Sequence, residues 1–244
     1  MTEGAANLSA ELPVSTASHD ATPIWPIRAV LFDLDGTLAD TAPDLGAALN
    51  ILRRRAGLVE LPIERIRPWV SHGGRGLIRG GFGLQADAPE VRPLLDALLS
   101  EYAAAICVHT RLFPGMDAVL DQLEARQLAW GIVTNKITRF AMPLLDQLGL
   151  LRRAGCVVCG DTLPVGKPDP APVRLACERL GIAPAACVLV GDDRRDIEAA
   201  RAAGAWSLAV TYGYGVETDP PVNWAAHSLL HSPTDLLHWL DRAP

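Results

Sequence analysis

Two aspartates, Asp33 and Asp35, follow a short apolar run and precede a glycine near the start of the chain. The run Ala29–Phe32 is typical of a buried strand, which would deliver both acids to its C-terminal end, where open α/β sheets bind ligands. Two carboxylates this close repel each other, so they require a nearby cation or a proton on one of them. The pair therefore indicates cation binding or acid–base chemistry.

Acid pairs of this kind also occur in turns and in sites of different chemistry. An Asp-Gly step alone can form a turn. An EF-hand calcium loop is disfavoured, because its glycine stands at the sixth position from the first acid and Gly36 stands at the fourth. A response-regulator receiver also combines acids, a threonine and a lysine, but its phosphoacceptor normally follows its acidic pair. The rest of the sequence is needed to distinguish these alternatives from one another.

Predicted strands and helices alternate along the chain after this first strand. Such alternation is typical of an α/β fold with a doubly wound, Rossmann-like parallel sheet and right-handed crossovers. The further strands are expected at Leu128–Val133, Cys156–Cys159, Cys187–Val190 and Ser207–Val210. The helices around them are expected at Met116–Arg126, Thr138–Leu148, Ala171–Leu180, Ile197–Ala203 and Pro233–Leu240.

Polar residues of complementary chemistry follow the predicted strands. Because the carboxyl ends of parallel strands share one edge of the sheet, these residues are expected to converge. Such a cluster can accommodate a hard divalent cation beside one lysine, and Mg²⁺ commonly keeps waters and shares a phosphate oxygen. The residues are Asp33 and Asp35 after the first strand, Thr134 and Asn135 after the second, Asp192, Asp193 and Asp196 after the fourth, and Lys167 before the helix that leads into the fourth.

The segment between the first and second strands, residues 42–112, reads almost wholly helical. An insertion at this point would stand over the acids and act as a lid. We therefore predict a core domain at 27–41 and 113–244, a helical cap domain at 42–112 and a disordered extension at 1–26. The cap helices are expected at Asp44–Arg55, Ile63–Trp69, Arg75–Arg79 and Pro93–Ile106.

Composition narrows the class of protein. The chain has 244 residues, 49% of them hydrophobic, and a net charge of −6, which fits a globular protein and gives no sign of nucleic-acid binding. It contains no apolar stretch approaching the length of a membrane span, and residues 1–26 lack the features of a signal peptide. The five cysteines favour reduced thiols in the cytoplasm. Cys156 and Cys159 lie in a predicted strand with their side chains on opposite faces, which disfavours a zinc or redox site.

The chain from about Ile27 onward resembles the haloacid dehalogenase superfamily, in its phosphatase branch with a helical cap. Four motifs carry the resemblance, and each is weak alone but together they are strong. They are Asp33-Leu34-Asp35-Gly36-Thr37, Thr134, Lys167 and Gly191-Asp192-Asp193-Arg194-Arg195-Asp196.

The resemblance implies that Asp33 attacks phosphorus to form an aspartyl-phosphate. Asp35 then acts as the general acid for the leaving alcohol and the general base for water. Thr134, the backbone amide of Asn135 and Lys167 bind the phosphoryl oxygens. Two of these residues can also serve purely structural roles, since Thr134 can cap a helix and Lys167 can be a solvated loop residue.

The resemblance also implies a Mg²⁺ site. Its ligands are a carboxylate oxygen of Asp33, the backbone carbonyl of Asp35 and the carboxylate of Asp192. Asp196 and Asp193 would orient these ligands. These last two acids can instead cap a helix or pair with the neighbouring arginines.

Other functions of the same fold remain to be considered. A true haloacid dehalogenase lacks the second acid of the first motif, so Asp35 argues for phosphate chemistry. A phosphohexomutase stays possible, because it differs mainly in how the cap controls water. A catalytically silent phosphate-binding module is disfavoured, since an unused cluster of acids would only destabilise the protein by self-repulsion.

Substrate choice is expected to lie in the cap, at the loop Ser71–Gly76. Glycines there allow close approach, and His72 and Arg75 can meet an anionic group, although Arg75 can equally be a solvated helix charge. The chain is similar to phosphoglycolate phosphatases and more so to bacterial N-acetylmuramate 6-phosphate phosphatases of peptidoglycan recycling. The segments that carry this similarity are Val108–Phe113, Trp130–Lys136, Tyr212–Tyr214 and Asn223-Trp224. Both substrates join a phosphate to a carboxylate, and the sequence leaves the choice and the oligomeric state open.

Overall fold

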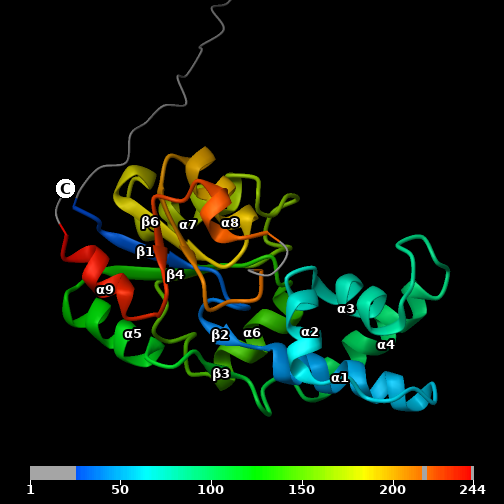
Figure 1. The fold of residues 1–244 in the computed structure, drawn as a ribbon. Helices are drawn as coiled ribbons and strands as arrows, with labels where there is room; N and C mark the ends of the chain where they lie inside the picture. The colour runs from blue at the N-terminus through cyan, green and yellow to red at the C-terminus, as the bar shows by residue number, and fades with distance from the viewer. Residues whose placement is uncertain (1–25, 216–218, 243–244) are drawn as a thin grey trace, which may run out of the picture.

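A parallel sheet of six strands carries β1 (Ala29–Phe32) between two neighbouring strands. The computed structural model describes residues 26–215 and 219–242 (Figure 1), so the predicted extension 1–26 lies outside the described residues except for Pro26. The strand order is β5-β4-β1-β6-β7-β8, and every pair is parallel. The other strands are β4 (Ala129–Val133), β5 (Cys156–Val158), β6 (Cys187–Gly191), β7 (Trp206–Val210) and β8 (Ser228–Leu230).

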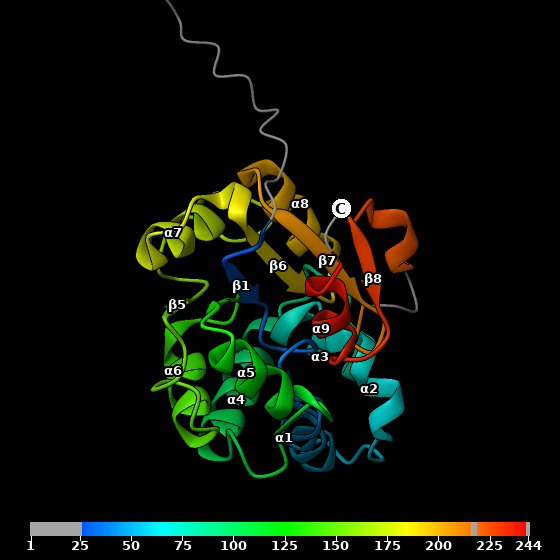
Figure 2. The same cartoon turned by 90° about the vertical axis from the view of Figure 1, so that its left-hand side faces the viewer.

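Helices cover both faces of this sheet, because alternate side chains of β1 pack in opposite directions. Val30 and Phe32 belong to one buried cluster, whereas Ala29 and Leu31 belong to another. Figure 2 shows α7 and α8 above the strands and α5 and α6 below them. The first cluster holds α5 (Met116–Ala125), α6 (Thr138–Gln147) and α9 (Asp235–Leu240), and the second holds α7 (Ala171–Leu180) and α8 (Arg194–Ala203). The predicted doubly wound α/β fold is confirmed.

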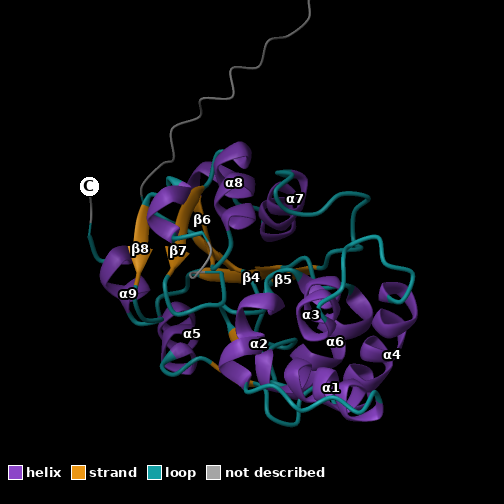
Figure 3. Ribbon diagram, turned by 45° about the vertical axis from the view of Figure 1, so that its right-hand side comes forward, coloured by secondary structure: helices purple, strands orange, loops and turns teal. Residues whose placement is uncertain are grey.

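Four of the helices between β1 and β4 pack on one another beside the sheet (Figure 3). They are α1 (Ala42–Arg55), α2 (Ile63–Val70), α3 (Gly73–Phe82) and α4 (Val91–Ala104), and we call them the four-helix unit. Two short strands, β2 (Ala39–Asp40) and β3 (Arg111–Leu112), pair antiparallel where the chain enters and leaves this unit. The two connections to the rest of the molecule therefore lie side by side.

The sequence did not predict several short elements. Strands β2 and β3 have two residues each, which is too short for a periodic pattern, and β8 falls in a segment that we expected to be loop. Helix α8 begins at Arg194 rather than Ile197. Helix α3 begins at Gly73 rather than Arg75, so the predicted loop Ser71–Gly76 is wrong beyond His72, and Gly73–Gly76 form the first turn of α3. Two 3-10 turns, at Pro184–Ala186 and Pro221–Trp224, complete the described elements. In the described part of the chain, no helix has the length and apolar character needed to cross a membrane.

The Cys156-x-x-Cys159 pair behaves as its strand position predicts. Cys156 packs in the cluster on the α7 and α8 face, whereas Cys159 packs in the cluster on the opposite face. Neither forms a disulfide, and burial raises the pKa of both thiols. The two thiols therefore do not act as a joint metal or redox site.

Candidate active site

Asp33 leaves the end of β1 and is brought against the end of β6. Its backbone N–H donates to the Val190 carbonyl at 2.9 Å, which continues the pairing of the two strands by one residue. The chain then turns at Gly36, whose φ of +87° favours glycine. A Cβ at this position would overlap the carboxylate of Asp192. Glycine is therefore required both for the turn and for the close approach of Asp192.

Lys167 is buried between two acids. Its Nζ lies 2.7 Å from Asp33 Oδ1, 2.6 Å from Asp196 Oδ1 and 2.6 Å from the carbonyl oxygen of Val133. These three acceptors match the three N–H bonds of an ammonium group. Burial alone would lower the pKa of Lys167, but the charges of Asp196 and Asp33 outweigh it and raise the pKa. The lysine is thus a fixed positive charge rather than a solvated loop residue.

Asn135 holds the backbone of that lysine on both sides. Its Oδ1 accepts from the N–H of Lys167 at 2.9 Å, and its Nδ2 donates to the carbonyl oxygen of Lys167, also at 2.9 Å. The side chain of Asn135, the second residue after β4, therefore fixes the position of the Lys167 backbone. This contact of the Asn135 side chain is separate from the predicted role of its backbone amide, binding a phosphoryl oxygen, which stays a prediction.

Asp192 and Asp196 are almost fully buried beside Asp33. Asp192 accepts from Thr37 Oγ1 at 3.1 Å and from the Tyr214 backbone N–H at 2.8 Å. One oxygen from each of the three acids lies within 4.8 Å of the others. Burial, together with the negative charges of Asp33 and Asp196, raises the pKa of Asp192 well above its ordinary value. The site therefore concentrates negative charge that a cation would relieve.

Asp193 caps α8 and holds Arg195. Its Oδ1 accepts from the backbone N–H of Arg195 at 2.9 Å and from Nε at 2.8 Å, and its Oδ2 lies 2.7 Å from Nη2. Asp196 completes a capping box by accepting from the N–H of Asp193 at 3.1 Å. Arg194 instead pairs with Asp219 at 2.7 Å. Asp193 thus performs both structural roles that its position suggested, helix capping and pairing with an arginine.

Asp35 pairs with a lysine that the sequence did not single out. Its Oδ1 accepts from Lys136 Nζ at 2.8 Å and from Thr41 Oγ1 at 2.5 Å. Lys136 also lies 4.7 Å from the centre of the Tyr102 ring, a cation–π contact with α4. Burial would lower the pKa of Lys136, but Asp35 and Tyr102 raise it. The sequence feature that could have identified Lys136 as a site residue was its position, two residues after Thr134.

Thr134 lies after β4 but is not the cap of the next helix. The N-cap position of α6 is Ile137, and the Asp161 carboxylate accepts from the N–H of Thr138 at 2.8 Å. The Thr134 hydroxyl accepts instead from the N–H of Lys136 at 3.1 Å. It therefore shapes the turn that follows the strand.

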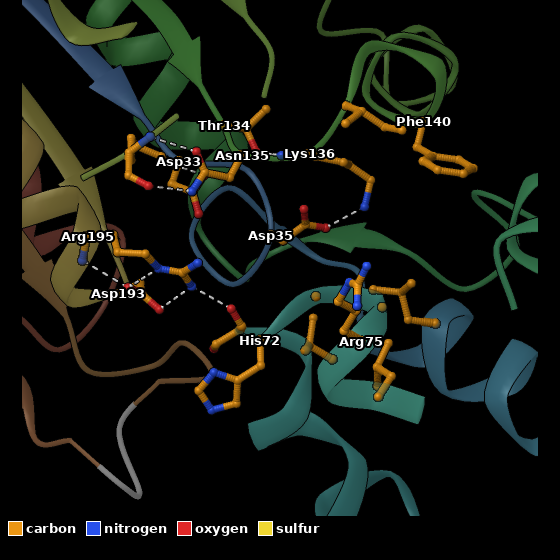
Figure 4. Close-up of a pocket in the computed structure, with 18 of the residues that line it drawn as sticks. Asp33, Asp35, His72, Arg75, Thr134, Asn135, Lys136, Phe140, Asp193 and Arg195 are labelled. Atoms are coloured by element: carbon orange, nitrogen blue, oxygen red, sulfur yellow. Dashed lines mark hydrogen bonds and ion pairs between the residues drawn. The ribbon is translucent and has the colours of Figure 1, made fainter. Parts of the chain in front are cut away.

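A cavity of about 420 Å³ joins these groups to the four-helix unit. All ten residues that the sequence predicted for the site line it. Figure 4 shows Arg75 facing Asp35 and Lys136, whereas the imidazole of His72 points away from Asp35. Three of the four Lys and Arg side chains in the lining pair with carboxylates, and among the described residues Arg75 pairs with none. Apolar side chains also line the cavity: Leu45, Val70, Leu77, Leu95, Leu99, Ile137 and Phe140.

Comparison with known proteins identifies the family. Residues 27–204 match the family model described as haloacid dehalogenase-like hydrolase. An N-acetylmuramic acid 6-phosphate phosphatase of Pseudomonas aeruginosa is 43% identical over 217 residues, covering 89% of this chain and 96% of that protein. A phosphoglycolate phosphatase of Xanthomonas campestris pv. campestris is 43% identical over 209 residues, covering 86% and 94%. The crystal structure of a predicted phosphoglycolate phosphatase from Haemophilus somnus is similar with a TM-score of 0.76 and 26% identity, covering 87% of this chain and 97% of that one. The chain therefore belongs to the haloacid dehalogenase-like hydrolases, in the branch of that family whose members are phosphatases.

Proposed function

We propose that this protein hydrolyses a small carboxylated phosphate monoester through an aspartyl-phosphate on Asp33, with Mg²⁺ as cofactor. The observation that carries the proposal is the ion pair of Asp33 with the buried Lys167 beside two further acids at one end of the cavity. Phosphoryl transfer demands little more than positioning and charge stabilisation, and these groups supply both.

Asp33 is the proposed nucleophile. Lys167 donates a hydrogen bond to Oδ1 of Asp33. The other carboxylate oxygen, Oδ2, would therefore attack phosphorus. As the new P–O bond forms, the bond to the ester oxygen breaks. Thr134, the Asn135 backbone amide and the Lys167 ammonium group would bind the phosphoryl oxygens and oppose their growing charge.

Asp35 is the proposed acid and base. Lys136 and Thr41 both donate to its Oδ1, so Oδ2 is the oxygen that can exchange a proton. Oδ2 would give its proton to the leaving alcohol and then accept one from the water that attacks the phosphorus. Phosphate leaves, and the Asp33 carboxylate is restored.

The acids fit a magnesium site. Carboxylate oxygens are the ligands that this hard cation prefers, and the raised pKa of Asp192 marks a concentration of buried negative charge. Asp33, Asp192 and the backbone carbonyl of Asp35 would hold the ion, which when bound neutralises charge on the phosphoryl group. Asp196 and Asp193 would support these ligands, through Lys167 and through the start of α8.

Residues 42–112 would act as a cap that closes the cavity. Arg75, which pairs with no carboxylate among the described residues, faces the acids from this cap and would bind the carboxylate of the substrate. Relatives named for phosphoglycolate and for N-acetylmuramic acid 6-phosphate support this substrate class. Unpaired thiols at all five cysteines, four of them buried, agree with the cytoplasmic location that we propose.

The proposal is tested by phosphate release from 2-phosphoglycolate and N-acetylmuramate 6-phosphate, with Mg²⁺ or with a chelator. We expect Mg²⁺-dependent release that the Asp33→Asn variant loses by at least about a thousandfold, while its fold is kept. An Asp146→Asn variant, changed on an exposed face of α6, serves as the control. Isomerisation of a hexose phosphate without phosphate release would point to the mutase, and binding without turnover to the silent module.

A further inference from the structure

Arg195 joins the core to the four-helix unit at the edge of the cavity (Figure 4). Its Nη2 lies 2.5 Å from the carbonyl oxygen of Ser71 and 2.7 Å from Asp193 Oδ2, while Nε lies 2.8 Å from Asp193 Oδ1. Guanidinium groups are planar and permanently charged, so one Arg195 can hold both partners at fixed angles.

Each end of this bridge is attached to a part of the site. On the core side, Asp193 caps α8 and its backbone N–H donates to Asp196, which in turn pairs with Lys167. On the other side, Ser71 follows the last turn of α2 and directly precedes His72. A carbonyl at a helix C-terminus carries partial negative charge, so a cation is favourable there.

The bridge is distinct from the contacts near β2 and β3, where the chain enters and leaves the four-helix unit. Near β2, Arg67 pairs with Asp40 at 2.6 Å, and Tyr214 Oη accepts from the N–H of Ala42 at 3.0 Å. By contrast, the segment Ser71–Gly76, which joins α2 to the first turn of α3, receives from the core a single hydrogen bond among the described residues, the one from Arg195. Without that bond, the hydrogen bonds of this segment among the described residues would all lie within the four-helix unit.

We propose that Arg195 is a positioning residue that holds the segment Ser71–Gly76, the junction of α2 and α3, against the start of α8 and so sets Arg75 over the acids. The inference rests on the proposed function only for its kinetic consequence. Arg195 contacts Asp193 and Ser71 through two separate nitrogens, Nε and Nη2, of one planar group, and the single nitrogen of a lysine cannot reproduce this fork.

Hydrogen exchange of the substrate-free protein tests the positioning directly. In Arg195→Met, we expect the amides of His72 and Gly76, which donate to carbonyls of their own unit, to exchange about tenfold faster, the size of effect of one charge-assisted hydrogen bond. Arg194→Met is the matched control, because this neighbouring arginine pairs with Asp219 outside the cavity. Unchanged exchange in both variants would overturn the proposal, whatever the enzyme's activity.

Kinetics then separate positioning from a direct catalytic contact. Arg195→Met should raise KM for the carboxylated substrate about tenfold, and change kcat/KM for a small aryl phosphate by less than about threefold. Arg195→Lys, which keeps the charge, should recover little of the loss. Equal losses on both substrates with normal exchange would contradict the proposal and assign Arg195 a direct contact with the phosphoryl group.

Discussion

At the scale of single residues, each lysine of the site is paired with an acid far away in the sequence, and Arg195 is paired with an acid two positions before it. Burying a charge without a partner is costly, so each ammonium or guanidinium group that meets an acid stabilises it in its charged form. Among the described residues of the cavity lining, Arg75 is the exception, which makes it the side chain available to an anionic substrate. The matched pairs are Lys167 with Asp33 and Asp196, Lys136 with Asp35, and Arg195 with Asp193.

Arg75 therefore gives a prediction about specificity. Arg75→Ala should raise KM for a carboxylated substrate about tenfold and leave that for an aryl phosphate nearly unchanged, because only the first presents a second anion. Arg79→Ala, on the exposed surface of the same helix, should affect neither. Steady-state kinetics on the two substrates checks this. Equal changes would return Arg75 to a solvated surface charge.

The sequence identified the residue types of the site better than their partners. Thr134 and the acids after β1 and β6 could be found because strong apolar runs precede them, whereas Lys167 was found from its place before the helix that leads into β6 and from the family motif. The bridge from Arg195 to Ser71 could not, since its acceptor is a backbone carbonyl 124 positions away that any residue would supply. The bond from Lys136 to Asp35 spans 101 positions and depends on how two loops approach each other.

At the scale of elements, the turn after β1 decides whether the acids can meet. Because Gly36 has no side chain, the carboxylate of Asp192 lies where a Cβ would otherwise be. The turn after β1 therefore packs closely against the acid that follows β6. Long apolar runs made the central strands predictable. Strands β2 and β3 could not be predicted, because two residues are too few for a periodic pattern and the strands pair only with each other. Strand β8 has three residues and pairs only with β7 at the edge of the sheet.

Gly36→Ala tests this turn. We expect a loss of about 3 kcal/mol in the free energy of unfolding, from the strained positive φ and the overlap with Asp192, and loss of phosphatase activity. Gly57→Ala is the matched control, because its φ of +72° carries the same strain but a Cβ there meets nothing within 4 Å. That variant should lose only about 1 kcal/mol. Urea denaturation measures both, and similar losses would show that the close approach to Asp192 does not matter.

At the scale of the whole molecule, a rigid sheet holds the acids while the four-helix unit supplies Arg75 from outside. The two connections to this unit pair as β2 and β3, and the hydrogen bond from Arg195 to Ser71 is a further link between the unit and the rest of the molecule. A cation bound among these buried acids would relieve their mutual repulsion and so would stabilise the core.

Magnesium should therefore raise the thermal stability of the entire protein. At ten times its dissociation constant, Mg²⁺ should raise Tm by about 3–5 °C, and a chelator should reverse the rise. Asp192→Asn should abolish the shift, while Asp146→Asn should keep it. Scanning calorimetry with and without the ion provides the check. An equal shift in all three proteins would place the ion elsewhere.

The covalent intermediate on Asp33 is the central claim, and trapping it is the most direct test. In Asp35→Asn, p-nitrophenyl phosphate should still phosphorylate the enzyme, because this leaving group needs no proton, whereas hydrolysis lacks its base. Rapid acid quenching followed by peptide mass spectrometry should find one phosphoryl group on the peptide that contains Asp33, formed together with one equivalent of p-nitrophenol. A peptide that stays unmodified while p-nitrophenol is released, or a phosphoryl group on another residue, would contradict the account.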